Sequence, residues 1–170
     1  MFEQDFTDAI AMLKADHRKV EQLFAAFEEA SGTSRKEKLA KEICTELKIH
    51  TMLEEEIFYP AFEGKIEQDL LDEAFVEHDG AKVLVNDIEA AEPDEEYYDA
   101  KVKVLCEQIE HHVKEEEKPA EGMFAQCRKA EVDLVELRDR MLARKEELMA
   151  QAEAGGLPPA QVTAVDLTAA

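Results

Sequence analysis

Hydrophobic residues recur at alternating steps of three and four along most of the chain, which is the spacing of helices that bury one face. The clearest apolar stripe lies within residues 8–30, and it consists of Ile10, Leu13, His17, Val20, Phe24 and Phe27. The same spacing returns in residues 34–59, 69–91 and 95–118. One histidine occupies a stripe position in each of the four stretches. The pattern therefore predicts four helices, each with a polar residue on its buried face.

Local signals predict where these helices begin and end. Asp5 or Thr7 is suited to cap the first helix, because short polar side chains accept hydrogen bonds from the free N–H groups of the first turn. Ser34 and Glu37 have the spacing of a capping box at the start of the second helix. Two prolines stop the second and fourth helices, since the residue before a proline disfavours helical backbone, and these are Pro60 and Pro119.

Four helices of similar length joined by short links predict an all-α fold, an up-down-up-down four-helix bundle. We assign this bundle to residues 1–130. An additional, strongly charged C-terminal helix is expected within residues 131–154. Residues 155–170 are expected to form a short disordered tail, because paired glycines and prolines cannot continue a helix, and these are Gly155, Gly156, Pro158 and Pro159.

Two matched motifs place a histidine four residues before a glutamate, and they are His50 with Glu54 and His112 with Glu116. On a helix this spacing puts both side chains on one face, one turn apart, where they can reach the same ion. Each motif follows an upstream histidine at nearly the same distance, 50 − 17 = 33 and 112 − 78 = 34, and these are His17 and His78. The doubled unit predicts a symmetric two-metal site near the middle of the bundle.

The chemistry of these six residues indicates which metals fit. Buried carboxylates need a counter-charge, and no arginine lies in the four apolar stripes. Imidazole and carboxylate ligands without thiolate suit iron, with manganese or zinc as alternatives. The Glu-x2-His pattern of ferritin-like proteins and the His-Glu-x2-His helix of zinc proteases are both absent. Two further kinds of residue lie outside the site: His111, a surface or supporting residue, and the scattered thiols Cys44, Cys106 and Cys127.

Composition and charge narrow the class of protein. A formal charge of −21 weighs against binding nucleic acid or an anionic membrane surface, and it attracts cations instead. No apolar run approaches the roughly 18–20 residues that cross a bilayer. The first residues are acidic and do not have the pattern of a signal peptide, and the odd number of cysteines suits a reducing compartment. We therefore expect a cytoplasmic protein.

The motifs resemble those of the hemerythrin-like, or HHE cation-binding, proteins over about residues 8–130. The matching stretches are Asp16-His17, His50 to Pro60, Glu77-His78 and His111 to Glu116. The resemblance implies a bundle that holds a non-haem di-iron centre, used for dioxygen storage, sensing, or reactions with peroxide or nitric oxide. It also implies a ligand set in which one iron is bound by His17 and His50, the other by His78 and His112, and both are bridged by Glu54 and Glu116.

One position departs from the pattern of oxygen-carrying hemerythrins. These proteins have a further histidine one turn after the position of His78, and here that position is Lys82. A protonated lysine cannot coordinate a metal ion. The extra ligand is therefore missing or supplied from elsewhere in the chain.

Three functions follow as hypotheses. The first is a di-iron protein that binds or senses dioxygen, nitric oxide or peroxide, and such a centre could turn peroxide over. The second is an iron store or buffer without catalysis. The third is a vestigial bundle that acts as an interaction module through its C-terminal helix.

Overall fold

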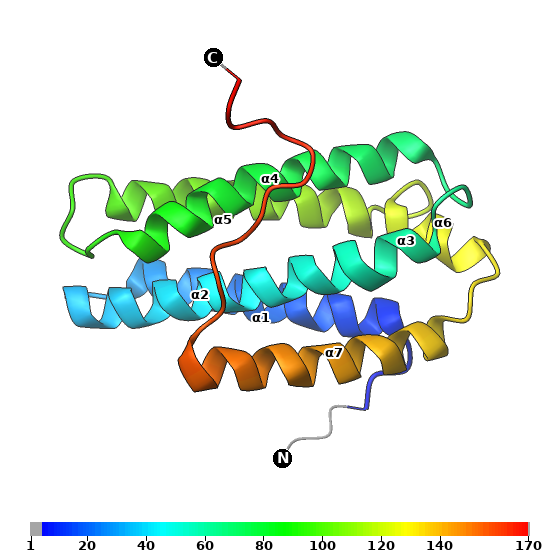
Figure 1. Cartoon of the computed structure of the whole chain (residues 1–170), viewed down its shortest axis with the longest axis horizontal. Helices are drawn as coiled ribbons and strands as arrows, with labels where there is room; N and C mark the ends of the chain where they lie inside the picture. The colour runs from blue at the N-terminus through cyan, green and yellow to red at the C-terminus, as the bar shows by residue number, and fades with distance from the viewer. Residues whose placement is uncertain (1–4, 170) are drawn as a thin grey trace.

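The computed structural model describes residues 5–169, and within that range the chain is helical with no strand. Four long helices form the bundle, and they are α1 (Ala9–Glu29), α2 (Thr33–Leu53), α4 (Gln68–Ala90) and α5 (Tyr98–Glu117). Helix α1 pairs with α2 and α4 pairs with α5, with the two hairpins stacked on one another (Figure 1). The predicted all-α four-helix bundle is confirmed.

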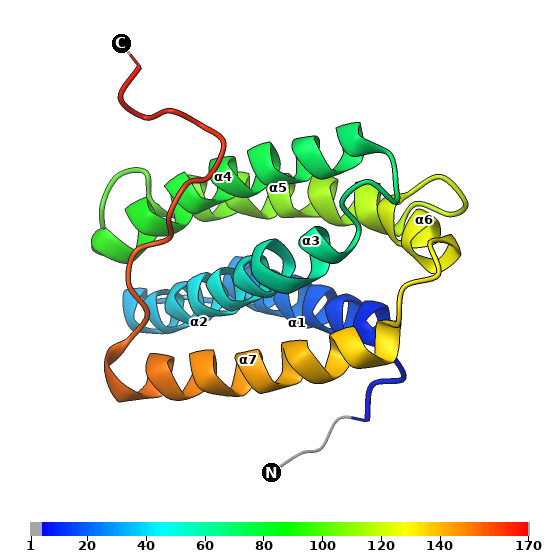
Figure 2. The same ribbon diagram turned by 45° about the vertical axis from the view of Figure 1, so that its right-hand side comes forward.

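Shorter elements close one end of the bundle and a further helix lies along its side. A π-helical turn, η1 (Glu54–Phe58), continues directly from α2 and leads into the single turn α3 (Tyr59–Ala61). After α5 the chain forms α6 (Met123–Lys129) and then α7 (Leu134–Gly155). Helix α7 runs alongside α1 and α2 on the face away from α4 and α5 (Figures 1 and 2).

The helix ends lie close to the expected positions, but two predicted caps are wrong. Asp8 caps α1, because its carboxylate accepts a hydrogen bond from Ala11 N–H at 2.8 Å, and neither Asp5 nor Thr7 takes that place. Helix α2 begins one residue before Ser34, after Gly32 with φ of 88°. Ser34 is thereby inside the first turn, and the expected capping box does not form.

The turn η1 changes how the following residues face the bundle. The N–H group of Tyr59 bonds to the carbonyl of Glu54, five residues back, whereas an α-helix bonds four residues back. The turn therefore contains one extra residue. Residues after the turn are rotated relative to a continuous α-helix, which changes the side of the helix on which Tyr59 lies.

The hydrophobic core consists of two clusters with a polar layer between them. One cluster contains Leu13, Leu53 and Phe58, and the other contains Val20 and Ile43. Along α1 the layer falls between Leu13 and Val20, which is where His17 lies. The four stripe histidines thus share one level of the bundle, as their positions in the sequence predict.

Helix α7 belongs to the first of these clusters. Leu137, Met141 and Leu148 are each at most 1% exposed and pack among residues of α1, α2 and α6. Asp133 caps the helix by accepting hydrogen bonds from the N–H groups of Val135 and Glu136. The C-terminal helix, expected from the charged stretch of the sequence, is therefore an integral part of the packed domain.

The segment after α7 differs from the expected disordered tail. Gly156, with φ of 89°, ends the helix, and residues 157–165 then cross α2 and run along α4 (Figure 1). Asn86 of α4 makes two hydrogen bonds to the backbone of Ala160, at 2.9 and 2.8 Å. Local sequence excludes a helix here, but polar side chains of α2 and α4 satisfy the backbone and give the segment a defined path.

Candidate metal centre

All six residues that the sequence singled out meet in the polar layer. They come from α1, α2, η1, α4 and α5, and they are His17, His50, Glu54, His78, His112 and Glu116. Each is at most 5% exposed. The helices bring the side chains together because every one of them sits in an apolar stripe that the bundle buries.

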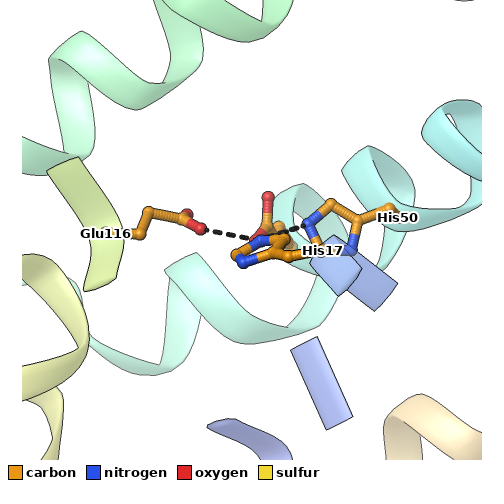
Figure 3. Close-up of side chains that lie close together, drawn as sticks. His17, His50 and Glu116 are labelled. Atoms are coloured by element: carbon orange, nitrogen blue, oxygen red, sulfur yellow. Dashed lines mark hydrogen bonds and ion pairs between the residues drawn. The ribbon is translucent and has the colours of Figure 1, made fainter. Parts of the chain in front are cut away.

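The first group of ligand atoms lies between α1 and α2. The Nε2 atoms of His17 and His50 are 3.2 Å apart. Oε1 of Glu54 is 3.0 Å from Nε2 of His50, and Oε2 of Glu116 is 3.3 Å from Nε2 of His17. Figure 3 shows His17 between His50 and Glu116, with both contacts drawn. Two nitrogens and two oxygens therefore face one point.

The second group repeats this arrangement between α4 and α5. The Nε2 atoms of His78 and His112 are 3.1 Å apart. Oε2 of Glu54 is 2.9 Å from Nε2 of His78, and Oε1 of Glu116 is 3.3 Å from Nε2 of His112. Each glutamate thus turns one oxygen to each group. This is the geometry of two carboxylates that can bridge two metal ions.

Tyr59 is a further residue of the second group. Its hydroxyl lies 2.7 Å from Oε1 of Glu116 and 3.0 Å from Oε2 of Glu54. The same oxygen is 3.3 Å from Nε2 of His78 and 3.4 Å from Nε2 of His112. Burial, followed by the charges of Glu116 and Glu54, raises the pKa of this fully buried phenol well above its usual value.

Sequence reasoning missed Tyr59 because it assumed an unbroken α-helix. Five residues after Glu54, an α-helical side chain points roughly 140° away from it. The extra residue in η1 removes most of that difference and brings Glu54 and Tyr59 to the same side. Lys82, by contrast, lies outside the layer, with its ammonium 2.7 Å from Oε2 of Glu55. The phenol of Tyr59, the first residue of α3, lies in the second group, whereas Lys82, at the position of the absent histidine, points elsewhere.

Each histidine also has a carboxylate on its outer nitrogen, Nδ1. The Nδ1 to oxygen distances are 2.9 Å for His17 with Glu117, 3.2 Å for His50 with Asp16, 3.3 Å for His112 with Glu77, and 3.5 Å for His78 with Glu55. At His17, His50 and His112 this carboxylate accepts the proton of Nδ1 and leaves the lone pair of Nε2 directed into the layer. This is the tautomer that a metal ligand requires. At His78 the carboxylate of Glu55 is within ion-pair distance of Nδ1 but does not form a hydrogen bond with it.

The residues fit a bound cation. With the outer protons in place, facing Nε2 lone pairs lie about 3 Å apart with no hydrogen to share. Within residues 5–169, Oε1 of Glu54 and Oε2 of Glu116 are buried without a hydrogen-bond donor. Two imidazolium rings would direct N–H groups at each other across the same gap. Protons therefore satisfy this layer poorly, and metal ions satisfy both the lone pairs and the carboxylates.

The electrostatics of the layer attract positive charge. Burial alone would lower the pKa of His50, but the charge of Glu54 and the hydrogen bond with Asp16 raise it to about 10. Burial and the neighbouring charge of Glu54 would raise the pKa of Glu116, but His112 and His17 bring it down to about 2. The carboxylates thus remain ionised, and metal ions entering the layer displace protons from the imidazoles.

The remaining candidates lie outside the two groups. His111 is on the surface, with its side chain 66% exposed and its Nε2 atom 3.3 Å from Oε2 of Glu77. Cys44 and Cys127 are buried and Cys106 is partly buried. Burial raises the pKa of the Cys44 thiol to about 12. In the described part of the chain no thiol joins the clustered ligand atoms.

Fold and site together define a four-helix bundle protein whose buried cluster of histidines and carboxylates is compatible with metal binding. The sequence profile described as the hemerythrin HHE cation binding domain matches residues 8–127. The chain therefore belongs to the hemerythrin HHE cation-binding family, as its motifs predicted.

Two similar proteins extend the comparison. A crystal structure of a hemerythrin HHE cation binding domain-containing protein from Mycobacterium kansasii shares the fold, with a TM-score of 0.74 and 24% identity over 87% of this chain and 91% of that one. A protein described as a DNA nickase, from a Nostoc strain, is 26% identical over 106 residues, which are 62% of this chain. The match spans 30% of the length of that relative.

No helix within residues 5–169 combines the length and the apolar character needed to span a bilayer.

Proposed function

We propose that this protein holds two iron ions and uses them to bind or sense a small oxidant or diatomic molecule: dioxygen, nitric oxide or peroxide. The observation that carries the proposal is the Tyr59 hydroxyl, which lies within 3.4 Å of ligand atoms of His78, His112, Glu54 and Glu116. Phenol oxygen is a hard donor that favours ferric iron over the ferrous state and over softer metals.

The residues would divide between the two ions. His17 and His50 would hold the first ion, and His78, His112 and Tyr59 would hold the second. Glu54 and Glu116 would bridge the pair, because each offers one oxygen to each group. Bound iron would supply one-electron redox chemistry and open positions for a small ligand.

A small cavity lies beside the second group of ligand atoms. It has a volume of about 10 Å³, room for a single water-sized molecule, and it lies between α4 and α5. His112 and Glu116 form its inner wall, and its outer wall includes Glu73, Glu77 and Glu115. The first ion would be more enclosed, since Phe124 stacks on the ring of His17 with centroids 5.9 Å apart.

The alternatives are less well supported by the same geometry. A freely exchanging iron buffer needs accessible ligands, whereas all six ligands and Tyr59 are at most 5% exposed. A reversible oxygen carrier is disfavoured, because an anionic phenol donor promotes oxidation of the ferrous state. The net charge of −21 gives no support for a DNA-directed activity like that of the Nostoc relative.

The test begins with metal-free protein reconstituted anaerobically with iron(II), manganese(II) or zinc(II). After desalting, we expect about two iron atoms per chain. Stopped-flow mixing of the ferrous protein with dioxygen, peroxide or nitric oxide should give fast spectral changes with at least one of them. Retention of one iron or none, or no spectral change with any of the three molecules, would contradict the proposal. A long-lived reversible dioxygen adduct would instead favour the oxygen-carrier alternative.

A further inference from the structure

The C-terminal part of the chain, beyond the matched residues 8–127, reaches the metal centre at two places. We propose that Lys145 of α7 and the segment 157–165 position two of the ligand histidines, His50 and His78, and thereby slow the release of metal from each group. The inference rests on the proposed metal centre. It assigns to α7 and the tail a positioning role that the four helices of the bundle do not perform themselves.

The first connection runs from α7 to His50. Nζ of Lys145 lies 2.5 Å from Oδ1 of Asp16, and Oδ2 of the same carboxylate lies 3.2 Å from Nδ1 of His50. The Asp16 side chain is 7% exposed and that of Lys145 is 18% exposed. A charge-assisted contact so shielded from water is stronger than a surface ion pair. Helix α7 therefore fixes the carboxylate that orients the His50 ring.

The second connection begins where the tail docks on α4. The carboxylate of Asp79, which is fully buried, accepts hydrogen bonds from three successive backbone N–H groups: Thr163 at 2.8 Å, Ala164 at 2.6 Å and Val165 at 2.7 Å. Three amide donors converging on one buried carboxylate hold this part of the tail at a fixed position beside α4.

From this anchor the tail reaches His78 through Lys82 and Glu55. Nζ of Lys82 donates to the carbonyl of Gln161 at 2.8 Å and lies 2.7 Å from Oε2 of Glu55. The hydroxyl of Thr163 donates to Oε1 of Glu55 at 2.9 Å. Oε2 of Glu55 in turn lies 3.5 Å from Nδ1 of His78, which is an electrostatic contact and not a hydrogen bond. The tail therefore reaches Glu55 in two ways: directly through the hydroxyl of Thr163, and indirectly through Lys82.

The two other histidines are held by the bundle alone. The carboxylate beside His17 belongs to Glu117, which pairs with Arg18 at 2.6 Å. The carboxylate beside His112 belongs to Glu77, whose other oxygen faces His111. Each metal group thus contains one histidine positioned within the bundle and one positioned through the C-terminal segment. Loss of the segment should affect both groups.

The test measures release of metal, without any turnover. Iron(II) and zinc(II) forms are mixed anaerobically with a colorimetric chelator, and the release rate is compared among the unaltered protein, Lys145→Met, and a truncation after Gly155. We expect metal release to be about 10- to 100-fold faster in both variants, because losing the hydrogen-bond partner of a metal ligand usually weakens metal binding by that factor. Arg140→Met is the matched control, since Arg140 is an exposed cation of α7 whose nearest partner is Glu136 at 3.7 Å.

Two further measurements separate positioning from folding. Lys145→Arg should release metal as slowly as the unaltered protein, because arginine keeps a cation beside Asp16. In the unaltered protein, metal loading should slow hydrogen exchange at the amides of Thr163, Ala164 and Val165, because coupling between two sites is reciprocal. Release from both variants at the rate of Arg140→Met, or unchanged exchange at these amides on zinc loading, would overturn the proposal. Failure of the unaltered protein to retain iron while it retains zinc would instead contradict only the proposed di-iron function.

Discussion

The hydroxyl of Tyr59 lies 2.7 Å from a carboxylate oxygen of Glu116, in a layer that the bundle seals from solvent. The phenol comes from the turn after α2, whereas the carboxylate comes from the end of α5. Their contact is made possible by the extra residue in η1. A hydrogen-bonded phenol at this point can become a metal donor as soon as a cation replaces its proton, since the cation offsets the charge of both oxygens.

Replacing Tyr59 by phenylalanine should remove the phenol-to-metal absorption of the ferric protein while two irons remain bound. The reason is that His78, His112, Glu54 and Glu116 stay in place around the second position. Visible absorption of the air-oxidised protein checks this. Tyr98→Phe is the control, because Tyr98 lies in the other hydrophobic cluster, near Phe27, and should leave the spectrum unchanged. An identical spectrum in Tyr59→Phe would show that the phenol does not bind iron.

Replacing Glu54 by alanine should abolish binding of the coupled metal pair. Its two oxygens serve both groups, at 3.0 Å from His50 and 2.9 Å from His78, so both positions lose a ligand at once. Metal analysis after anaerobic reconstitution measures the loss. Glu107→Ala, at an exposed position of α5, should retain the full content. Equal metal content in the two variants would contradict the bridging arrangement.

Removing the metal should destabilise the folded chain. A ligand that binds only the native state stabilises it by about 4 kcal/mol when the concentration of free ligand is about a thousand times the Kd. Metal-free protein should therefore unfold at lower temperature or lower denaturant than the loaded form, as followed by circular dichroism. An increase in stability on chelation would show that the protonated layer is the preferred native state.

Met141→Ala in α7 should cost about 2–5 kcal/mol of unfolding free energy, because the side chain is fully buried and its loss leaves a cavity. Arg140→Ala, one residue earlier and exposed, should change stability by less than about 0.5 kcal/mol. Urea denaturation at equilibrium compares the two. Similar stabilities would mean that α7 packs on the bundle only loosely.

The apolar periodicity was enough to predict the helices, and with them the six residues of the polar layer. Each of the four stripes contains one histidine, and two of these histidines are followed by glutamate at the helical spacing, which leaves little freedom once the bundle is packed. Glu54 still lies on the expected side because the π-helical turn begins at that residue. Everything upstream of the turn keeps α-helical register.

The features that the sequence did not reveal depend on departures from local regularity or on distant partners. Tyr59 needed the widened turn, which no spacing rule signals. The position of residues 157–165 depends on Asp79 and Asn86, which belong to a helix some 80 residues earlier in the chain. Lys145 is one charge among many on α7, and only the packing shows that it reaches Asp16. Contacts of this kind depend on tertiary structure, and neither the composition nor the hydrophobic periodicity of the sequence predicts them.

The polar layer also divides the interior, since one hydrophobic cluster lies on each side of it. Apolar contact across the layer is interrupted, and without metal its place is taken by charges of both signs that pair imperfectly. Bound ions would connect all four long helices at one level. The metal-loaded protein should therefore unfold in a single step, whereas the two halves of the metal-free protein should open independently.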